Sequence, residues 1–320
     1  MSRAHGQELR GQYVRRLPSP AELKKRQPIV LTERDRQLLS AVHLHGFLTT
    51  DLIELAFFPP QDGSRSSASS KAYERLRELW LWGYLERIEL PVARVLGGRR
   101  PFLYALGRQA VSVVERELGT RTMPVQPRRL DRLDHVFIDH DLQAAALWAN
   151  LTAELRERRG CRWLWLGERE LRAKRMHVRL RSKKGDDYWA PFLPDAYFEV
   201  TYPNGDVQVA LVEIDMGTLT LRRFMRKVQA FEQARWDDVF RKHLRRDDFE
   251  VYVLTHSWRR LQSLWQVARR VVDVDRCGDY YFATFEALEP DEFPEWEWCD
   301  LNNERCDGVL DAESAEAERT

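Results

Sequence analysis

The sequence predicts a mixed α and β protein built from two parts, each with its own order of helices and strands. Three observations predict this fold class. Apolar residues recur with a helical period in three stretches between residues 32 and 83, and two short apolar strands around a glycine-rich basic turn follow them. Beyond residue 130, helical segments and apolar strands alternate. At about 100–200 residues per domain, 320 residues provide for two domains.

Composition changes along the chain predict four segments. Residues 1–29 carry charges and prolines without an apolar period, which predicts a basic flexible arm. The first domain is expected at 30–122, and a proline-containing basic linker follows from Met123 to Arg129. The second domain is expected at 130–286, with an acidic tail at 287–320.

The overall charge is balanced, with 51 Lys and Arg against 50 Asp and Glu, so net charge by itself indicates no partner. The basic start and acidic end suggest nucleic-acid contact at the front of the chain. Four widely spaced cysteines form no CxxC pair, which disfavours a metal site built on thiolates. No apolar run is long enough to span a membrane, and no secretory signal is recognisable. The expectation is a cytoplasmic protein associated with the nucleoid or a plasmid.

Two helices open the first domain. Thr32 is a good N-cap, and Asp35 stands at the capping-box position, so the first helix is expected to begin there and to end at Gly46. Thr49 or Thr50 caps a second, short helix that prolines 59 and 60 stop.

A third helix and a hairpin follow. The helix is expected from Lys71 to Gly83, and strands are expected at 84–90 and 102–106 around the basic tip at 97–100. A further helix is expected at 107–118. Three helices followed by a hairpin with a basic tip is the order of a winged helix-turn-helix domain.

This domain order suits double-stranded DNA. A third helix can enter a major groove about 12 Å wide, while basic side chains contact phosphates. The candidate DNA-binding residues are Arg65, Lys71, Arg75, Arg77, Arg99 and Arg100. The alternative is a winged helix used only for protein contact or dimerisation.

The second domain has a recognisable order of elements. Helices are expected at 135–159, 219–235 and 258–272, with strands at 161–166, 194–200, 207–215, 249–255 and 280–285. Together with Pro194-Asp195 and Glu213-Ile214-Asp215, this order resembles the restriction-endonuclease-like, or PD-(D/E)xK, nuclease fold.

The motifs together resemble one family. They are Leu31 to Leu39 at the start of the winged helix, His140-Asp141-Leu142, Pro194-Asp195-Ala196, Val212 to Thr218, and Lys227. In this order, over residues 30 to 285, they resemble the replication-relaxation family of bacterial plasmids and other mobile elements. The resemblance implies a role in replication and relaxation of plasmid DNA, with protein partners in a replication or mobilisation complex.

The nuclease pattern assigns candidate catalytic residues. Asp195 and Glu213 would bind Mg²⁺, which can activate a water for attack on phosphorus. A lysine usually stands two residues after the glutamate, but position 215 is Asp. Lys227, at the edge of the buried face of the next helix, is the candidate replacement; the alternative is a surface lysine. Asp215 would be a third metal ligand or an added negative charge.

The hairpin turn around Asn204-Gly205 leaves the geometry of this site open. A loop of two or four residues pairs Asp195 with Ile214, which places Asp195 and Glu213 on opposite faces of the sheet. A three-residue loop pairs Asp195 with Glu213 directly, because a shift of one residue reverses every side chain.

Three functions therefore remain. The first is a DNA-binding replication or mobilisation factor without catalysis of its own. The second is a metal-dependent endonuclease or nickase that uses Asp195, Glu213 and Lys227, with Mg²⁺ as its cofactor. The third is a transcriptional regulator of a plasmid or phage. The sequence leaves the oligomeric state open. Trp296 and Trp298 in the acidic tail are expected to dock on the domain or on a partner.

Overall fold

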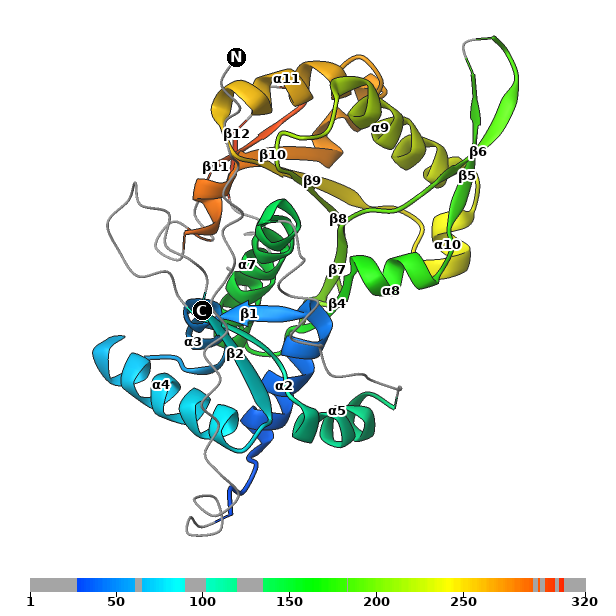
Figure 1. Ribbon diagram of the computed structural model, residues 1–320. Coiled ribbons are helices and arrows are strands. Elements are labelled where there is room, and N and C mark those ends of the chain that lie inside the picture. The colour runs from blue at the N-terminus through cyan, green and yellow to red at the C-terminus, as the bar shows by residue number, and fades with distance from the viewer. Residues whose placement is uncertain are drawn as a thin grey trace, which may run out of the picture. The chain divides into compact units, whose positions relative to one another are not determined.

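The computed structural model describes residues 28–60, 65–89, 102–119, 135–182, 184–289, 293, 297–302 and 305–307. The chain divides into two compact units, Met1–Ala145 and Ala146–Thr320, and each is described by itself. Both combine helices with sheets, so the predicted mixed α and β class is confirmed (Figure 1). Most of the predicted basic arm, the hairpin tip and the predicted linker lie outside the described residues.

Where the structure describes it, the N-terminal unit contains three helices, a three-stranded sheet and a further helix. Its elements are α2 (Glu33–His45), β1 (Phe47–Thr49), α3 (Thr50–Phe57), α4 (Arg65–Leu81), β2 (Leu85–Glu89), β3 (Phe102–Leu106) and α5 (Val111–Leu118). The sheet is antiparallel with the strand order β1-β3-β2. Strand β1 was not predicted, because it has only three residues and pairs with β3, far along the chain.

Local signals explain where these helices begin. At α2, the Thr32 hydroxyl accepts from the backbone N–H of Asp35, and the Asp35 carboxylate accepts from the backbone N–H of Thr32 at 2.6 Å. This is the predicted capping box. Helix α4 begins one and a half turns before the predicted Lys71, because Ala68 and Ala72 are both buried and extend its apolar stripe.

The C-terminal unit is organised around a seven-stranded sheet. Its helices are α7 (His135–Glu157, which begins in the N-terminal unit), α8 (Glu168–Ala173), α9 (Leu221–Trp236), α10 (Val239–Leu244) and α11 (Trp258–Ala268). The strands are β4 (Arg162–Gly167), β7 (Ala196–Thr201), β8 (Val207–Asp215), β9 (Glu250–Thr255), β10 (Tyr280–Thr284), β11 (Glu297–Asp300) and β12 (Arg305–Asp307). Two further strands, β5 (His177–Arg181) and β6 (Asp187–Pro191), form a separate hairpin.

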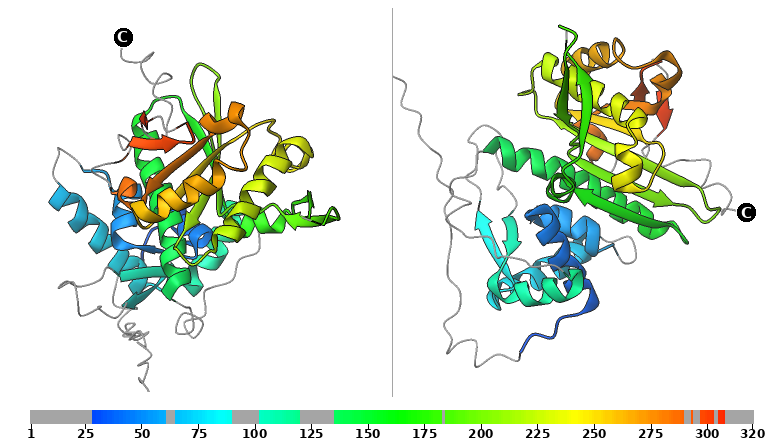
Figure 2. Two further views of the ribbon diagram at one scale, coloured as in Figure 1. Left: turned by 90° about the horizontal axis from the view of Figure 1, so that it is seen from above. Right: turned by 90° about the vertical axis from the view of Figure 1, so that its right-hand side faces the viewer.

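The sheet order is β12-β11-β10-β9-β8-β7-β4. Strands β8, β9 and β10 run parallel, and the remaining neighbours are antiparallel. Helix α9 connects β8 toward β9, and α11 connects β9 toward β10, as parallel neighbours require. Figures 1 and 2 show both helices on the same side of the sheet, where Phe224, Val228 and Leu261 join the core with Leu211 and Val253.

The loop between β7 and β8 sets the register of the hairpin. The Tyr202 N–H donates to the Asp206 carbonyl at 2.9 Å, which leaves a loop of three residues, 203–205. Gly205 has a φ of 94°, which glycine adopts without steric cost. Pairing then runs to Ala196 opposite Val212, so Asp195 comes next to Glu213.

Part of the predicted acidic tail belongs to the sheet. Strand β11 pairs with β10, and Trp298 is buried with its ring edge toward Tyr252, 5.2 Å between centroids. The Trp265 indole N–H donates to the Asp300 carbonyl at 2.7 Å. Trp298 thus docks on its own domain. The apolar area that this one side chain buries stabilises a segment whose other residues are mostly polar. Trp296 lies outside the described residues.

No helix within the described ranges is both long and apolar enough to cross a membrane.

Candidate functional site

The structure brings together Asp195, Glu213 and Lys227. The Lys227 Nζ donates to both carboxylate oxygens of Glu213, at 2.5 and 2.6 Å, and lies 3.5 Å from Asp195 Oδ1. The other oxygen of Asp195, Oδ2, accepts from the backbone N–H of Ile214 at 2.8 Å. One carboxylate from the residue before β7, one from β8 and one amine from α9 therefore converge on a single point, which we call the acid–lysine cluster.

Burial strengthens the attraction between the charges of this cluster, because little water is present to screen them. The side chain of Glu213 is 2% exposed and that of Lys227 30% exposed. Burial by itself lowers the pKa of Lys227, but the charges of Asp195 and Glu213 oppose it, and the net shift raises the pKa above its usual value. Lys227 is therefore a permanent cation at neutral pH, and it neutralises one of the two negative charges.

The local sequence explains how Lys227 reaches the sheet. Thr220 caps α9 by accepting from the Arg223 N–H, and Phe224, Val228 and Phe231 form the buried stripe of the helix. Lys227 borders this stripe at helical spacing, as the sequence predicts. Its aliphatic stem lies along the core, and its amine extends to the carboxylates at the end of the hairpin.

Asp215 shares a face of β8 with Glu213 but has a different partner. Its carboxylate receives two hydrogen bonds from Arg260 of α11, Nε to Oδ2 at 2.8 Å and Nη2 to Oδ1 at 2.9 Å. The Thr255 hydroxyl and the Gly217 N–H also donate to Oδ2. This arrangement gives Asp215 the environment of a structural ion pair that joins β8 to α11.

The donor set can be compared with what a cation needs. Within the part of the chain that the structure describes, no three His, Cys, Asp or Glu side chains gather in a way that could hold a metal ion. A cation at the acid–lysine cluster would have Asp195 and Glu213 as its protein ligands. Mg²⁺ tolerates this, because it commonly uses one or two carboxylates and fills its remaining positions with water and phosphate oxygens.

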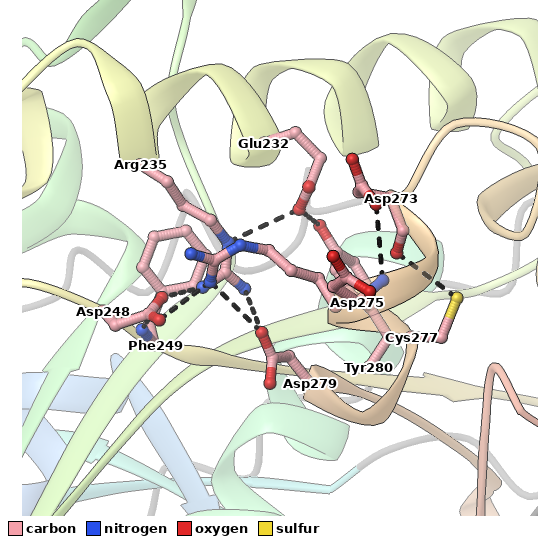
Figure 3. Close-up of polar contacts among 10 residues, drawn as sticks. Glu232, Arg235, Asp248, Phe249, Asp273, Asp275, Cys277, Asp279 and Tyr280 are labelled. Carbon is pink, nitrogen blue, oxygen red and sulfur yellow. Dashed lines mark hydrogen bonds and ion pairs between the residues drawn. The ribbon is translucent and has the colours of Figure 1, made fainter.

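A second group of charges lies further along α9, around Arg235 (Figure 3). The guanidinium is 3% exposed, pairs with Asp248 and lies 4.1 Å from the ring centroid of Phe249. Glu232 and Asp279 approach it at 3.4 and 3.6 Å. Because arginine supplies the counter-charge here, the group ties α9 to the strands β9 and β10 and leaves no acidic site for a cation.

Four of the predicted DNA-binding residues lie on α4, and the structure describes the side chains of three of them. Lys71 and Arg77 are exposed. Arg75 instead donates to the buried Asp35, from Nε to Oδ1 at 2.9 Å and from Nη2 to Oδ2 at 2.5 Å, and also to the Val30 carbonyl at 2.8 Å. Arg75 therefore joins α4 to the start of α2. The side chain of Arg65, and both Arg99 and Arg100, lie outside the described residues.

Comparison with known proteins adds the family. The family model described as replication-relaxation matches residues 39–245, which covers more than half of the chain and includes the whole acid–lysine cluster. The chain belongs to the replication-relaxation family. No curated protein and no solved structure matches it.

Membership confirms the resemblance found in the sequence and suggests a role in the replication or relaxation of plasmid or mobile-element DNA. In this replication-relaxation protein, sequence reasoning missed Arg260 and Arg235. Arg260 lies 45 positions after the aspartate that it binds. The signal available for it was weak: an arginine near the start of an amphipathic helix, which usually indicates a solvated position.

Proposed function

We propose that this replication-relaxation protein binds duplex DNA through α4 and the β2–β3 hairpin, and that its C-terminal unit extends the DNA footprint or recruits partners without catalysis of its own. The observation that carries the proposal is topological. The order α2-β1-α3-α4-β2-β3, with the sheet order β1-β3-β2, supports the winged helix expected from the sequence. In such domains the third helix enters the major groove and the hairpin reaches the adjacent backbone.

The side chains of α4 indicate which of its basic residues are available to contact DNA. Lys71 and Arg77 are exposed and Tyr73 is half exposed, so the exposed surface of the helix offers two cations and an aromatic hydroxyl. Arg75 is held by Asp35 and acts within the fold. The proposal therefore assigns DNA contact to Lys71 and Arg77. It extends this contact to Arg65, the first residue of α4, and to Arg99 and Arg100, which lie outside the described residues.

Fluorescence anisotropy with a labelled duplex, recorded over a range of salt concentrations, tests this assignment. Arg77→Ala should weaken binding and reduce the salt slope by about one, as loss of one phosphate contact does. Arg99→Ala with Arg100→Ala should act in the same direction. Arg116→Ala, an exposed arginine on α5, is the matched control. Equal affinity of Arg77→Ala, the tip variant and this control would show that α4 and the hairpin are not the interface.

The acid–lysine cluster favours a second candidate function, metal-dependent cleavage of a phosphodiester. Two observations support this candidate: β7, β8, α9 and β9 come in this order along the chain, and Lys227 contacts both Asp195 and Glu213. Bound Mg²⁺ would supply an activated water and neutralise charge on phosphate. Asp195 and Glu213 would hold it. Lys227 would place its cation near the phosphate, where negative charge develops in the transition state.

Incubation of supercoiled plasmid with the full chain and Mg²⁺ or Mn²⁺ tests this second function. Nicked or linear product should appear with the unaltered chain and should be absent with Asp195→Asn and Glu213→Gln. Asp206→Asn, which removes an exposed carboxylate from the β7–β8 turn, is the control. If the plasmid stays supercoiled with the unaltered chain and with every variant, the nuclease function is wrong and the non-catalytic function stands.

A further inference from the structure

The β5–β6 hairpin forms an arm of the C-terminal unit. Its two strands pair only with each other among the described residues, as a separate two-stranded antiparallel sheet. In Figure 1 the hairpin extends outward past α9 and α10. A hairpin of this length is marginal by itself in water, so its attachment to the unit determines its stability.

The two faces of the arm differ in chemistry. Val178 and Leu180 are buried, belong to the same core as α9, and hold the hairpin in place. On the other face His177, Arg179 and Arg181 are exposed. The strand alternation of β5 thus separates an apolar inner face from a basic outer face.

Exposed tryptophan accompanies these basic residues. Trp189 of β6 lies directly opposite Arg179 in the register and is 69% exposed. Trp236, at the end of α9, is 76% exposed. The following residue, Asp237, accepts from the Arg179 backbone N–H at 3.1 Å, which places the end of α9 beside β5. No other aromatic side chain in the described part of the chain is as exposed as these two.

Charge distinguishes the kind of partner that this surface fits. Residues 174–191 contain six Lys or Arg and two Asp, in a chain whose formal net charge is only +1. Asp187 pairs with Arg179 at 2.8 Å, and Arg181 donates from Nε to the Gly185 carbonyl at 3.1 Å, so both guanidinium groups are oriented on the outer face. Cations beside an exposed indole match a nucleic-acid strand, whose phosphates pair with arginine and whose unpaired bases stack on aromatic rings.

We propose that the outer face of the β5–β6 hairpin, formed by His177, Arg179, Arg181 and Trp189, binds single-stranded DNA. Single strands are specified because a base inside a duplex has no free ring face for an indole to stack on. The proposal goes beyond the duplex contact assigned to α4 and does not depend on it.

The base of the arm is joined to the acid–lysine cluster through a short stretch of chain. Strand β6 ends at Pro191, and the chain continues through residues 192–194 to Asp195. The Phe192 ring packs against Phe231 of α9, with 5.8 Å between the ring centroids, and this contact anchors the base of the arm to the helix that carries Lys227.

Anisotropy of the full chain with a labelled oligo(dT) of about 20 nucleotides tests the proposal, since one binding fold covers roughly 4–16 nucleotides. Trp189→Ala should weaken binding about 5- to 150-fold, the range for loss of one stacked base. Trp189→Phe should retain most of the affinity, because a ring face remains. Arg179→Ala with Arg181→Ala should weaken binding and lower the salt slope by about one to two.

Two matched controls come from α11 and the turn after it. The first control, Trp258→Ala, removes a tryptophan that is 56% exposed. The second, Arg259→Ala with Arg270→Ala, removes two exposed arginines. Both control variants should bind oligo(dT) with the affinity of the unaltered chain. The proposal is overturned if Trp189→Ala binds like Trp258→Ala, or if the arm variants lose duplex and single strand equally. Arg77→Ala should change duplex binding alone, so failure of the α4 interface and failure of the arm give different results.

Discussion

Lys227 of α9 donates to both carboxylate oxygens of Glu213 in β8, at 2.5 and 2.6 Å, across 14 positions of the chain. The same amine lies 3.5 Å from Asp195. One lysine thus contacts two acidic side chains that the β7–β8 register brings together, and it neutralises one of their two charges. The candidate site consequently has a structural role in addition to any role in chemistry, and the two roles can be separated by measurement.

Removal of the lysine should destabilise the C-terminal unit. Lys227→Met leaves Glu213 buried without its cation, and breaking a buried pair in this way costs about 3–5 kcal/mol. Urea unfolding followed by tryptophan fluorescence measures the loss. The double variant Glu213→Gln with Lys227→Met should recover part of it, because the stranded charge is gone. Equal losses in the single and double variants would contradict a direct Lys227–Glu213 interaction.

Substitutions of Arg75 and Arg77 should differ in their effect on the stability of the N-terminal unit, because Arg75 pairs with a buried aspartate and Arg77 is exposed. Arg75→Met leaves the buried Asp35 without its guanidinium and should lower the free energy of unfolding of the N-terminal unit by about 3–5 kcal/mol. Arg77→Ala should change it by less than about 0.5 kcal/mol, as exposed positions do. Thermal denaturation compares the two variants. An Arg75→Met chain as stable as the unaltered one would show that the Asp35 pair contributes nothing.

The N-terminal unit should lose stability in mild acid through His45. Burial lowers the pKa of His45 from its usual 6.5 to about 3. Between these values the unfolded chain binds a proton that the folded unit does not, so stability is complete above about pH 6.5 and falls as the pH drops toward 3. The slope reaches about 1.4 kcal/mol per pH unit.

Amide exchange of α2 between pH 7 and 5, corrected for intrinsic rates, measures this slope. His45→Gln should flatten it. His177→Gln, at an exposed position of β5, should leave it unchanged. A slope that persists in His45→Gln would assign the acid sensitivity to another group.

Two glycines with similar backbone angles should tolerate alanine differently. Gly205 has a φ of 94° with open space around it, so Gly205→Ala should cost about 1–2 kcal/mol from the backbone alone. Gly217 has a φ of 78°, and a Cβ there would lie 2.6 Å from His256 Cε1, so Gly217→Ala should cost more. Adding His256→Ala should bring Gly217→Ala back toward the Gly205→Ala cost. Equal losses at the two glycines would show that the imidazole moves aside.

Local patterns determined much of the protein. The capping box of Thr32 and Asp35, the long helix at 135–157 and the strand at 207–215 were all predicted from the sequence, and the structure contains them. These features can be predicted from a few neighbouring residues. A helix cap involves residues three positions apart, and side chains repeat every 3.6 residues in a helix and every two in a strand. The same local motifs, taken in order, identified the family.

The tertiary structure alone decided which side chains meet. Whether Asp195 faces Glu213 depended on a loop of three residues, since two or four would reverse the face. Asp215 is bound by Arg260, and Arg75 by Asp35, across 45 and 40 positions. Such pairs depend on the order of strands and on helix packing, and no periodic pattern in the sequence encodes them. A charged residue has the same local signature whether it binds another side chain or faces water, and only the folded chain distinguishes the two.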